Sequence, residues 1–270
     1  MMRTANSKKQ ILEEYLRDTD SIAIAYSAGV DSTFLLRCAH DILGDKAIAV
    51  TAVSPFFPKE ELDEAVSFCK TEGIRHVITE TDPLSDERIA ANTPDRCYLC
   101  KRKIFEQIKA VAAEYGIYHV ADGSNTDDDG DYRPGMRALR ELGIESPLKA
   151  AGLSKAEIRE LSKELSLGIW DKPALACLAT RIVTGEKITA EKLSMTGSAE
   201  RYIRSLGIRQ LRVRMHGKLA RIETDKQDIQ RIAAEHEKID IYLKKLGYTA
   251  VTLDLGGYRT GSTNTPDTDR

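Results

Sequence analysis

The chain has 270 residues, enough for one or two domains, and its 40 lysines and arginines against 42 aspartates and glutamates give a formal charge of -2. Because no overall positive field favours nucleic acid or anionic lipid, any phosphate site has to be local. The apolar runs are far shorter than the ~20 residues of a membrane span, no export signal is visible, and five cysteines are too few for a disulfide framework, so we expect a soluble, cytoplasmic protein.

The first half of the chain alternates short β-rich apolar runs with helical stretches. Such alternation predicts a doubly wound parallel α/β sheet with helices on both faces. Ligands bind beyond the carboxyl ends of the strands in these sheets, so the loops at 27–32 and 123–131 are the ones expected to carry a site. The strands are expected at 21–26, 47–53, 75–79 and 118–122, and the helices at 33–43, 59–72 and 98–114.

The pattern changes after residue 172, and from about residue 190 it predicts a smaller α+β domain. The expected order is a helix, strands at 210–216 and 219–223, a helix at 226–246 and a strand at 250–255. The expected organisation is therefore a first domain at 1–172, a linker at 173–187, a second domain at 188–258 and a frayed tail at 259–270.

The sequence SAGVDS, residues 27–32, lies where the first strand ends and the first helix of the sheet begins. Backbone N–H groups and the helix dipole converge there and can hold a phosphate, with hydroxyl donors from Ser27 and Ser32. Asp31 would repel a bare phosphate, so it is expected to orient the loop or to share a Mg²⁺ ion with the nucleotide. The alternative is an ordinary turn with an N-capping serine.

This loop closely resembles the PP-loop, S-G-G-x-D-S, of the ATP pyrophosphatases, which adenylate a substrate and release pyrophosphate. Gly29 matches a glycine of the motif, whereas Ala28 stands where the motif has its first glycine. A methyl group is tolerated there if φ is negative, because only a positive φ strongly favours glycine.

Three of the five cysteines are candidates for chemistry. Cys97 and Cys100 form a C-x-x-C at an expected helix start, where the helix dipole favours thiolates. The pair fits a redox couple, half of a zinc site or part of an iron–sulfur site. Cys177 is the third candidate, and Arg181 would stabilise its thiolate if this segment is helical. Cys38 and Cys69 lie on apolar helix stretches and are expected to be buried.

The PP-loop, the acidic sequence DGSNTDDDGDYRPG at 122–135 and PALACLATR at 173–181 together resemble one family over residues 10–258. It is the family of ATP-dependent sulfur transferases of nickel-pincer nucleotide biosynthesis, which serve lactate racemase and convert two carboxylates of a pyridinium dicarboxylate mononucleotide to thiocarboxylates. The resemblance implies ATP and Mg²⁺ as cofactors, formation of AMP and pyrophosphate, and a homo-oligomer, in some members a hexamer.

By the same resemblance Cys177 matches the cysteine that carries sulfur. Some members sacrifice that cysteine and end as dehydroalanine, whereas members with all three thiols are thought to hold a 4Fe–4S cluster. This chain has all three, so Cys97, Cys100 and Cys177 are expected to bind such a cluster, reloaded by an external sulfur donor. In this chain Thr180 replaces a serine that usually follows the sulfur-carrying cysteine.

The loop after the fourth expected strand is either a solvated turn or part of the nucleotide site. Gly123 would allow close backbone approach, Asn125 could read adenine or ribose, and one of the aspartates at 127–131 could hold Mg²⁺. The residues do not distinguish among these aspartates.

In QLRVRMHGKLARIE, residues 210–223, the pair Gly217-Lys218 suits a type II′ hairpin turn. That turn would place Arg214 opposite Arg221, an unfavourable like-charge pair that an anion between them would make favourable. Arg212 and Arg214 also match the arginines that the family resemblance assigns to the substrate phosphate. The alternative is a solvated basic edge.

Two other functions would also be compatible with the PP-loop. A PP-loop tRNA thiolase also combines this loop with a C-x-x-C and a third cysteine, but the near-neutral charge and the lack of a basic aromatic stretch argue against it. A non-catalytic regulator that binds a nucleotide is the second rival, and pyrophosphate release would distinguish it from an enzyme.

Overall fold

The computed structural model describes residues 4–130, 134–173 and 177–259. The chain divides into two compact units, one formed by residues 1–83 with 97–175 and the other by 84–96 with 176–270. Residues 84–96, which the sequence analysis assigned to the first domain, thus group with the C-terminal part of the chain. Asp131, three residues of the expected linker (174–176) and the tail from residue 260 lie outside the described residues.

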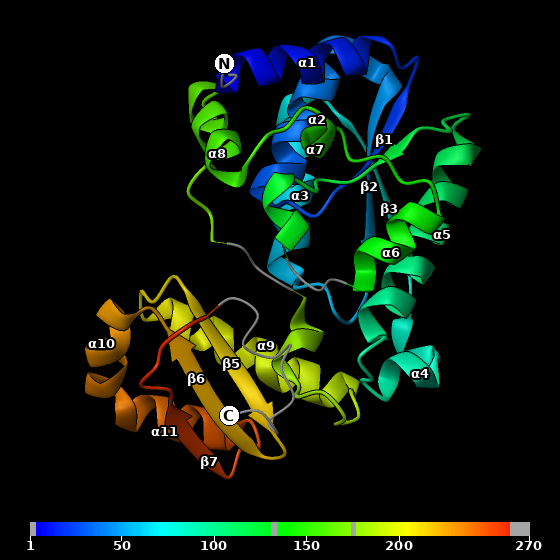
Figure 1. Cartoon of the computed structure of the whole chain (residues 1–270). Coiled ribbons are helices and arrows are strands. Elements are labelled where there is room, and N and C mark those ends of the chain that lie inside the picture. The colour runs from blue at the N-terminus through cyan, green and yellow to red at the C-terminus, as the bar shows by residue number, and fades with distance from the viewer. Residues whose placement is uncertain (1–3, 131–133, 174–176, 260–270) are drawn as a thin grey trace. The chain divides into compact units, whose positions relative to one another are not determined.

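The first unit contains a four-stranded, all-parallel sheet with the strand order β3-β2-β1-β4 (Figure 1). Its strands are β1 (Ile22–Ala25), β2 (Ala47–Val53), β3 (Arg75–Glu80) and β4 (Val120–Ala121). The chain moves outward from β1 to β3 and then crosses back to β4, so β1 and β4 are neighbours whose following loops leave the same edge of the sheet. Such a switch in strand order is where doubly wound sheets bind ligands.

Alternating strand residues face two separate cores. Ile22 and Ile24 of β1 pack with one helical layer, whereas Ala23 between them packs with the other. In Figure 1 the first layer holds α1, α2, α3 and α8, and the opposite face is covered by α5 and α6. Because both of their faces are buried, β1 and β2 are almost continuously apolar, as the sequence pattern predicted, whereas the edge strand β3 carries polar and exposed residues.

Four helices of the first unit, α1, α6, α7 and α8, and one helix of the second unit, α4, were not predicted from the sequence. The remaining helices agree closely with the expected ranges. The bounds are α1 (Ala5–Arg17), α2 (Val30–Leu43), α3 (Lys59–Glu72), α4 (Glu87–Ala90), α5 (Arg96–Glu114), α6 (Pro134–Glu141), α7 (Pro147–Ala150) and α8 (Lys155–Glu164), with short 3₁₀ turns at Gly44–Lys46, Pro83–Ser85 and Thr126–Gly130.

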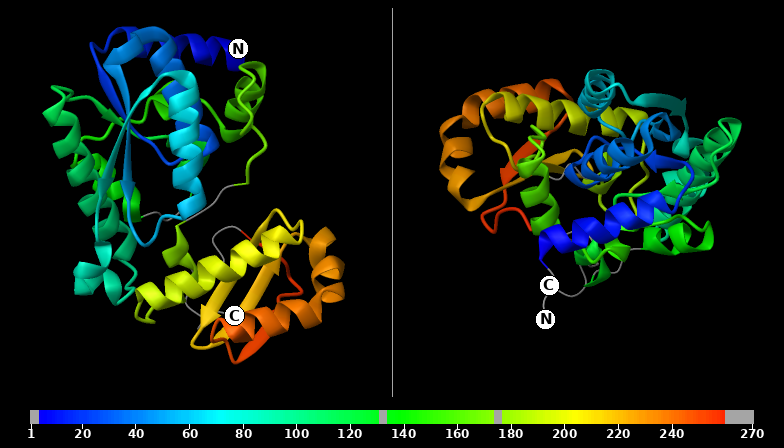
Figure 2. Two further views of the ribbon diagram at one scale, coloured as in Figure 1. Left: turned by 180° about the vertical axis from the view of Figure 1, so that it is seen from behind. Right: turned by 90° about the horizontal axis from the view of Figure 1, so that it is seen from above.

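The second unit packs helices against a small mixed sheet of order β5-β6-β7, in which β5 and β6 are antiparallel and β6 and β7 parallel. Figure 2 shows α9 and α11 over this sheet, and their apolar faces form one core with its strands. The elements are a 3₁₀ turn η4 (Leu178–Arg181), α9 (Ala190–Ser205), β5 (Leu211–His216), β6 (Leu219–Thr224), a 3₁₀ turn at Lys226–Asp228, α10 (Ile229–Ala234), α11 (His236–Lys245) and β7 (Ala250–Leu253).

Two expected elements are shorter or broken. The helix expected at 226–246 is interrupted at Glu235, whose ψ of 15° leaves helical geometry, and the His236 ring nitrogen Nδ1 lies 2.9 Å from the Ala233 carbonyl there. The strand expected at 118–122 is reduced to two residues, with Tyr118 80% exposed before it. None of the helices in the described part of the chain is long and apolar enough to cross a membrane.

Candidate functional site

The loop that follows β1 folds around two serine hydroxyls. The Oγ atoms of Ser27 and Ser32 are 3.1 Å apart, and Ser32 Oγ also donates to the Gly29 carbonyl at 3.2 Å. Gly29 is the N-cap of α2 and has no capping side chain, so no N-cap side chain accepts a hydrogen bond from the first N–H groups of α2. A loop of this kind at a helix N-terminus is suited to an anionic ligand.

Ala28 has a φ of 54°, in the left-handed region. The condition under which a methyl group is tolerated at this position, a negative φ, is therefore not met. An L-residue with a Cβ atom loses about 1–2 kcal/mol in this conformation, whereas glycine does not. The loop therefore keeps the backbone shape of a glycine motif at an alanine.

Gly123, which follows β4, is packed against the start of α2. A Cβ atom at this position would lie 2.9 Å from the backbone nitrogen of Ser32 and 3.3 Å from the Asp31 carbonyl carbon. The residue thus brings the loop after β4 directly against the loop after β1. Any side chain here would force these two loops apart, which explains the glycine without reference to a ligand.

Asp31 is half-buried, and its buried Oδ1 atom has no hydrogen-bond partner among the described residues. Burial raises its pKa; Lys155 and Arg159 act in the opposite direction, and Asp128 and Asp127 add to the increase. In the free protein, burial therefore disfavours the ionised Asp31 carboxylate, which has both positive and negative neighbours. A carboxylate in such surroundings is suited to bind a cation or a metal–nucleotide complex.

The loop at 125–128 is ordered by its own carboxylates. Asp128 Oδ2 accepts from the Asn125 backbone N–H at 3.0 Å, and Asp127 Oδ2 accepts from the backbone N–H of Lys155 at 2.9 Å. Asn125 is 3% exposed, and its Oδ1 accepts from the Asp127 backbone N–H. Asp127 and Asp128 therefore shape the loop, and both lie close enough to Asp31 to influence its ionisation.

Lys172, near the end of the first unit, contacts the loop at residues 27–32 that follows β1. The sequence did not predict a role for this lysine. Its Nζ atom lies 3.0 Å from the Ala28 carbonyl oxygen, 3.0 Å from Glu61 Oε2 and 2.5 Å from Glu64 Oε2. No sequence signal marked it, because the three partners are 144, 111 and 108 residues away along the chain.

The five cysteines lie in very different surroundings. Cys97 and Cys100 occupy the first turn of α5, as expected, one half-buried and the other buried, and Cys177 is exposed. Cys38 and Cys69 are buried as predicted, and burial raises the pKa of each thiol to about 12. No group of three or more His, Cys, Asp or Glu side chains that could hold a metal occurs among the described residues, so the three-cysteine cluster stays a prediction from the sequence.

The turn that follows Cys177 is held by residues from the segment 84–96. Asn92, 1% exposed, donates its side-chain amide to the carbonyls of Ile182 and Val183 at 3.1 and 2.8 Å. Arg96 bonds both the Asn92 side chain at 2.6 Å and the Ala179 carbonyl at 3.1 Å. These contacts are why 84–96 groups with the second unit.

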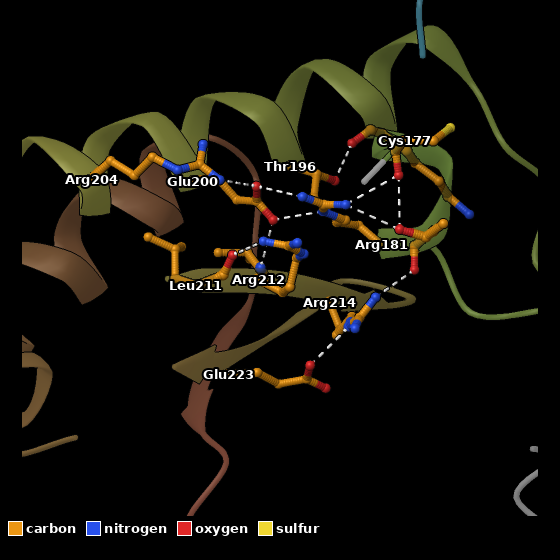
Figure 3. Close-up of polar contacts among 12 residues, drawn as sticks. Cys177, Arg181, Thr196, Glu200, Arg204, Leu211, Arg212, Arg214 and Glu223 are labelled. Carbon is orange, nitrogen blue, oxygen red and sulfur yellow. Dashed lines mark hydrogen bonds and ion pairs between the residues drawn. The ribbon is translucent and has the colours of Figure 1, made fainter. Parts of the chain in front are cut away.

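Arg181 joins the same turn to α9 through a buried ion pair (Figure 3). Its Nε and Nη2 atoms donate to the two oxygens of Glu200 at 2.7 and 2.9 Å, and both side chains are 1% exposed. Its Nη1 atom donates to the Cys177 carbonyl at 3.1 Å. The segment 178–181 is a 3₁₀ turn, so the arginine contacts the Cys177 backbone, a role different from the thiolate contact expected from the sequence.

The arginine hairpin has the predicted register. Arg214 lies opposite Arg221 and Arg212 opposite Glu223, and Gly217 has a φ of 59° at the first turn position, as a type II′ turn requires. Glu223 supplies the anion between the like charges, because its two oxygens accept from Arg214 Nε at 3.1 Å and from Arg221 Nη2 at 3.0 Å. The repulsion expected at this pair is therefore relieved within the protein.

Among the described residues of this cluster, more buried side chains are arginines than glutamates. Three arginines, 181, 212 and 214, are at most 4% exposed, against the two buried glutamates 200 and 223. Burial and then the charge of Arg181 lower the pKa of Arg212 to about 10, and burial lowers that of Arg214. A bound anion would offset the unfavourable free energy of burying these positive charges. Phosphate is an anion that arginine side chains bind well.

Comparison with known proteins gives the chain its family. No family model matches it. It is 27% identical to an argininosuccinate synthase of Natronomonas pharaonis over 165 residues, 57% of this chain, and together with the parallel sheet and the SAGVDS loop this defines a PP-loop α/β protein with a smaller C-terminal domain.

It is also 42% identical to an uncharacterized protein of Synechocystis sp. and 38% identical to the pyridinium-3,5-bisthiocarboxylic acid mononucleotide synthase of Lactiplantibacillus plantarum, each over at least 96% of both chains. The chain belongs to the family of this synthase, which confirms the resemblance drawn from its motifs.

Proposed function

We propose that this protein is an ATP-dependent sulfurtransferase that converts the two carboxylates of a pyridinium-3,5-dicarboxylate mononucleotide into thiocarboxylates. The observation that carries the proposal is the presence, in a member of this family, of the two chemical features that such an enzyme needs. The first unit holds a PP-loop beside a half-buried carboxylate, and the second holds a buried arginine cluster bonded to the backbone of an exposed cysteine.

ATP solves the problem that a carboxylate has a poor leaving group. The substrate oxygen attacks the α-phosphorus, pyrophosphate leaves, and the resulting acyl-adenylate has AMP as a good leaving group. In this proposal the phosphates lie against Ser27, Gly29 and Ser32 at the N-terminus of α2, and Asp31 holds Mg²⁺ together with the nucleotide. Gly123 and Asn125, on the loop after β4, complete the nucleotide site.

The arginine cluster binds the phosphate of the mononucleotide. Arg212 lies with its guanidinium 5.0 Å from the centre of the Tyr258 ring, and Arg214 Nη1 donates to the Thr180 carbonyl at 2.9 Å. Both side chains are thus fixed before a ligand arrives, which limits the entropy lost on binding. A phosphate would add negative charge beside these buried arginines.

Cys177 performs the sulfur step in this proposal. Its thiolate attacks the acyl-adenylate, AMP leaves, and a thioester forms. A β-elimination then transfers the Cα proton of residue 177 to a base and breaks the Cβ–S bond, which leaves a thiocarboxylate on the substrate and dehydroalanine at position 177. Cys97, Cys100 and Cys177 would alternatively hold a 4Fe–4S cluster, which would supply sulfide on an open iron and spare the cysteine.

Two measurements test the function. Incubation with ATP and the carboxylated mononucleotide should release pyrophosphate and AMP, and ADP with inorganic phosphate as the products would refute the PP-loop assignment. A tRNA gel shift separates this enzyme from a tRNA thiolase, which alone should bind tRNA. Pyrophosphate release separates both enzymes from a nucleotide-binding regulator.

The fate of Cys177 distinguishes the two sulfur routes. After several turnovers of anaerobically prepared protein, mass spectrometry should find Cys177 intact in the cluster route, together with iron and sulfide that any single Cys→Ala change at the three positions removes. In the sacrificial route the residue is lighter by the mass of H₂S in proportion to product.

A further inference from the structure

The ammonium group of Lys172 has all of its hydrogen bonds assigned. A lysine Nζ carries three protons, and this one has three acceptors within 3.0 Å, namely the Ala28 carbonyl and the carboxylates of Glu61 and Glu64. The side chain is 12% exposed, and that of Glu61 6%. With its charge neutralised and its protons used, Lys172 is built to hold the loop, and no proton is left for a phosphate.

The residue that Lys172 holds is the one whose backbone is strained. Ala28 adopts the left-handed conformation in which a Cβ atom is unfavourable, and its own side chain is 2% exposed. A charged donor on its carbonyl oxygen fixes the orientation of the peptide that follows. That peptide leads directly into Gly29, the N-cap of α2.

The backbone that carries Lys172 is anchored in turn. Arg159 of α8 donates to the carbonyl oxygens of Trp170 and Lys172 at 2.8 and 2.6 Å. Arg159 also lies near Asp31, where its charge lowers the pKa of that carboxylate. A continuous series of contacts thus runs from α8 through residues 170–172 to the turn between β1 and α2.

We propose that Lys172 is a positioning residue of the nucleotide loop, which keeps Ala28 left-handed so that the N–H groups of α2 face the phosphates of ATP. The proposal rests on the proposed function in taking ATP as the ligand of this loop. It assigns to Lys172 no contact with the nucleotide. Its consequence is that a glycine at position 28 makes Lys172 dispensable, because glycine adopts the left-handed conformation without help.

The test is a rescue experiment on the full-length protein. Lys172→Met removes the donor and should weaken ATP binding about tenfold, as expected for one charge-assisted hydrogen bond. Adding Ala28→Gly to this variant should restore the affinity to within about threefold of the wild type, since the strain that Lys172 offsets is gone. Trp170, the one tryptophan of the chain, gives a fluorescence readout of ATP titrations.

Lys109→Met is the matched control. Lys109 also donates to a backbone carbonyl, that of Leu142 at 2.7 Å, but lies outside the nucleotide loop, and its loss should leave ATP affinity unchanged. Because Lys172→Met leaves Glu61 with one partner fewer, the comparison is repeated in a Lys172→Met, Glu61→Gln background, in which no buried carboxylate loses its counter-charge. The same rescue by glycine is expected there.

Hydrogen exchange of the free protein provides a second readout that needs no ligand. Peptides covering residues 27–33 should exchange faster in Lys172→Met and return to the wild-type rate when Ala28→Gly is added. Unchanged affinity and exchange in Lys172→Met would overturn the proposal, and so would losses that glycine fails to rescue, since these would indicate direct contact with the nucleotide. If the wild type binds no ATP, the proposed function fails and the exchange data alone decide the role of Lys172.

Discussion

Replacing Glu200 with glutamine should destabilise the second unit more than any loss of a surface charge. The carboxylate is 1% exposed and accepts four hydrogen bonds, two from Arg181, one from Arg204 and one from the backbone N–H of Val213. The amide keeps the shape but removes the charge, and its nitrogen turns an N–H toward donors that need an acceptor. Breaking a buried pair in this way costs about 3–5 kcal/mol.

The pKa of Glu200 leads to a similar magnitude by an independent route. Burial alone would raise this pKa, but the charge and hydrogen bonds of Arg181, with Arg204 and Arg212, lower it from 4.5 to about 2. A pKa lowered on folding means that the stabilisation is complete above pH 5 and is lost as the pH falls toward 2. At 1.36 kcal/mol per pH unit it amounts to about 3 kcal/mol, of which about 2 kcal/mol is lost by pH 3.

Urea unfolding at pH 7 and pH 3, with hydrogen exchange of peptides from α9, β5 and β6, measures both effects. Glu200→Gln should lower the free energy of unfolding of this unit by about 3 kcal/mol at pH 7 and by about 1 kcal/mol at pH 3. Glu235→Gln is the control, because Glu235 pairs with Lys238 at the surface, and its loss should cost less than about 1 kcal/mol. Two results would refute the reasoning. One is an equal loss of unfolding free energy in Glu200→Gln and Glu235→Gln, and the other is a loss in Glu200→Gln that is as large at pH 3 as at pH 7.

The remaining predictions concern the nucleotide loop and the arginine hairpin. Asp31→Asn should raise the unfolding midpoint of the free protein at pH 7, because it removes a buried charge whose pKa is raised by burial, while abolishing pyrophosphate release; a lower midpoint in calorimetry would contradict this. Ala28→Gly should change the free energy of unfolding by no more than about 1 kcal/mol, since relief of about 1–2 kcal/mol of strain is offset by the loss of a buried methyl group worth about 1 kcal/mol; a larger change in urea titration would show that another contact is involved. Arg212→Ala and Arg214→Ala should each weaken binding of the mononucleotide about ten- to hundredfold but not that of ATP, measured by calorimetric titration; equal losses for both ligands would indicate misfolding.

Structural features that depend on residues close together in the chain could be predicted from the sequence. The alternation of apolar runs gave the parallel sheet, and Gly217 gave the hairpin register, because two residues fix a turn and the turn fixes every pair behind it. The burial of Cys38 and Cys69 followed from their apolar neighbours in the same helices.

Contacts between side chains that are far apart in the sequence could not be predicted from it. Glu200 lies on α9 between Ala199 and Arg201, and a glutamate in a helix is usually exposed. Its pairing with Arg181 exists only once α9 packs against the turn at 178–181. The positive φ of Ala28 was missed for a related reason, since local preference argues against it and a distant lysine at position 172 supports it.

The grouping of residues 84–96 with the C-terminal unit means that the chain passes between the two units three times, after residues 83, 96 and 175. No single cut can therefore release either unit, and a C-terminal fragment that starts in the linker would lack Asn92, which bonds carbonyls 90 residues further along the chain. During synthesis α4 leaves the ribosome long before its partners exist. Its neighbours in the finished second unit follow the whole first unit in the chain, so during synthesis the second unit cannot be completed before the first unit has been made.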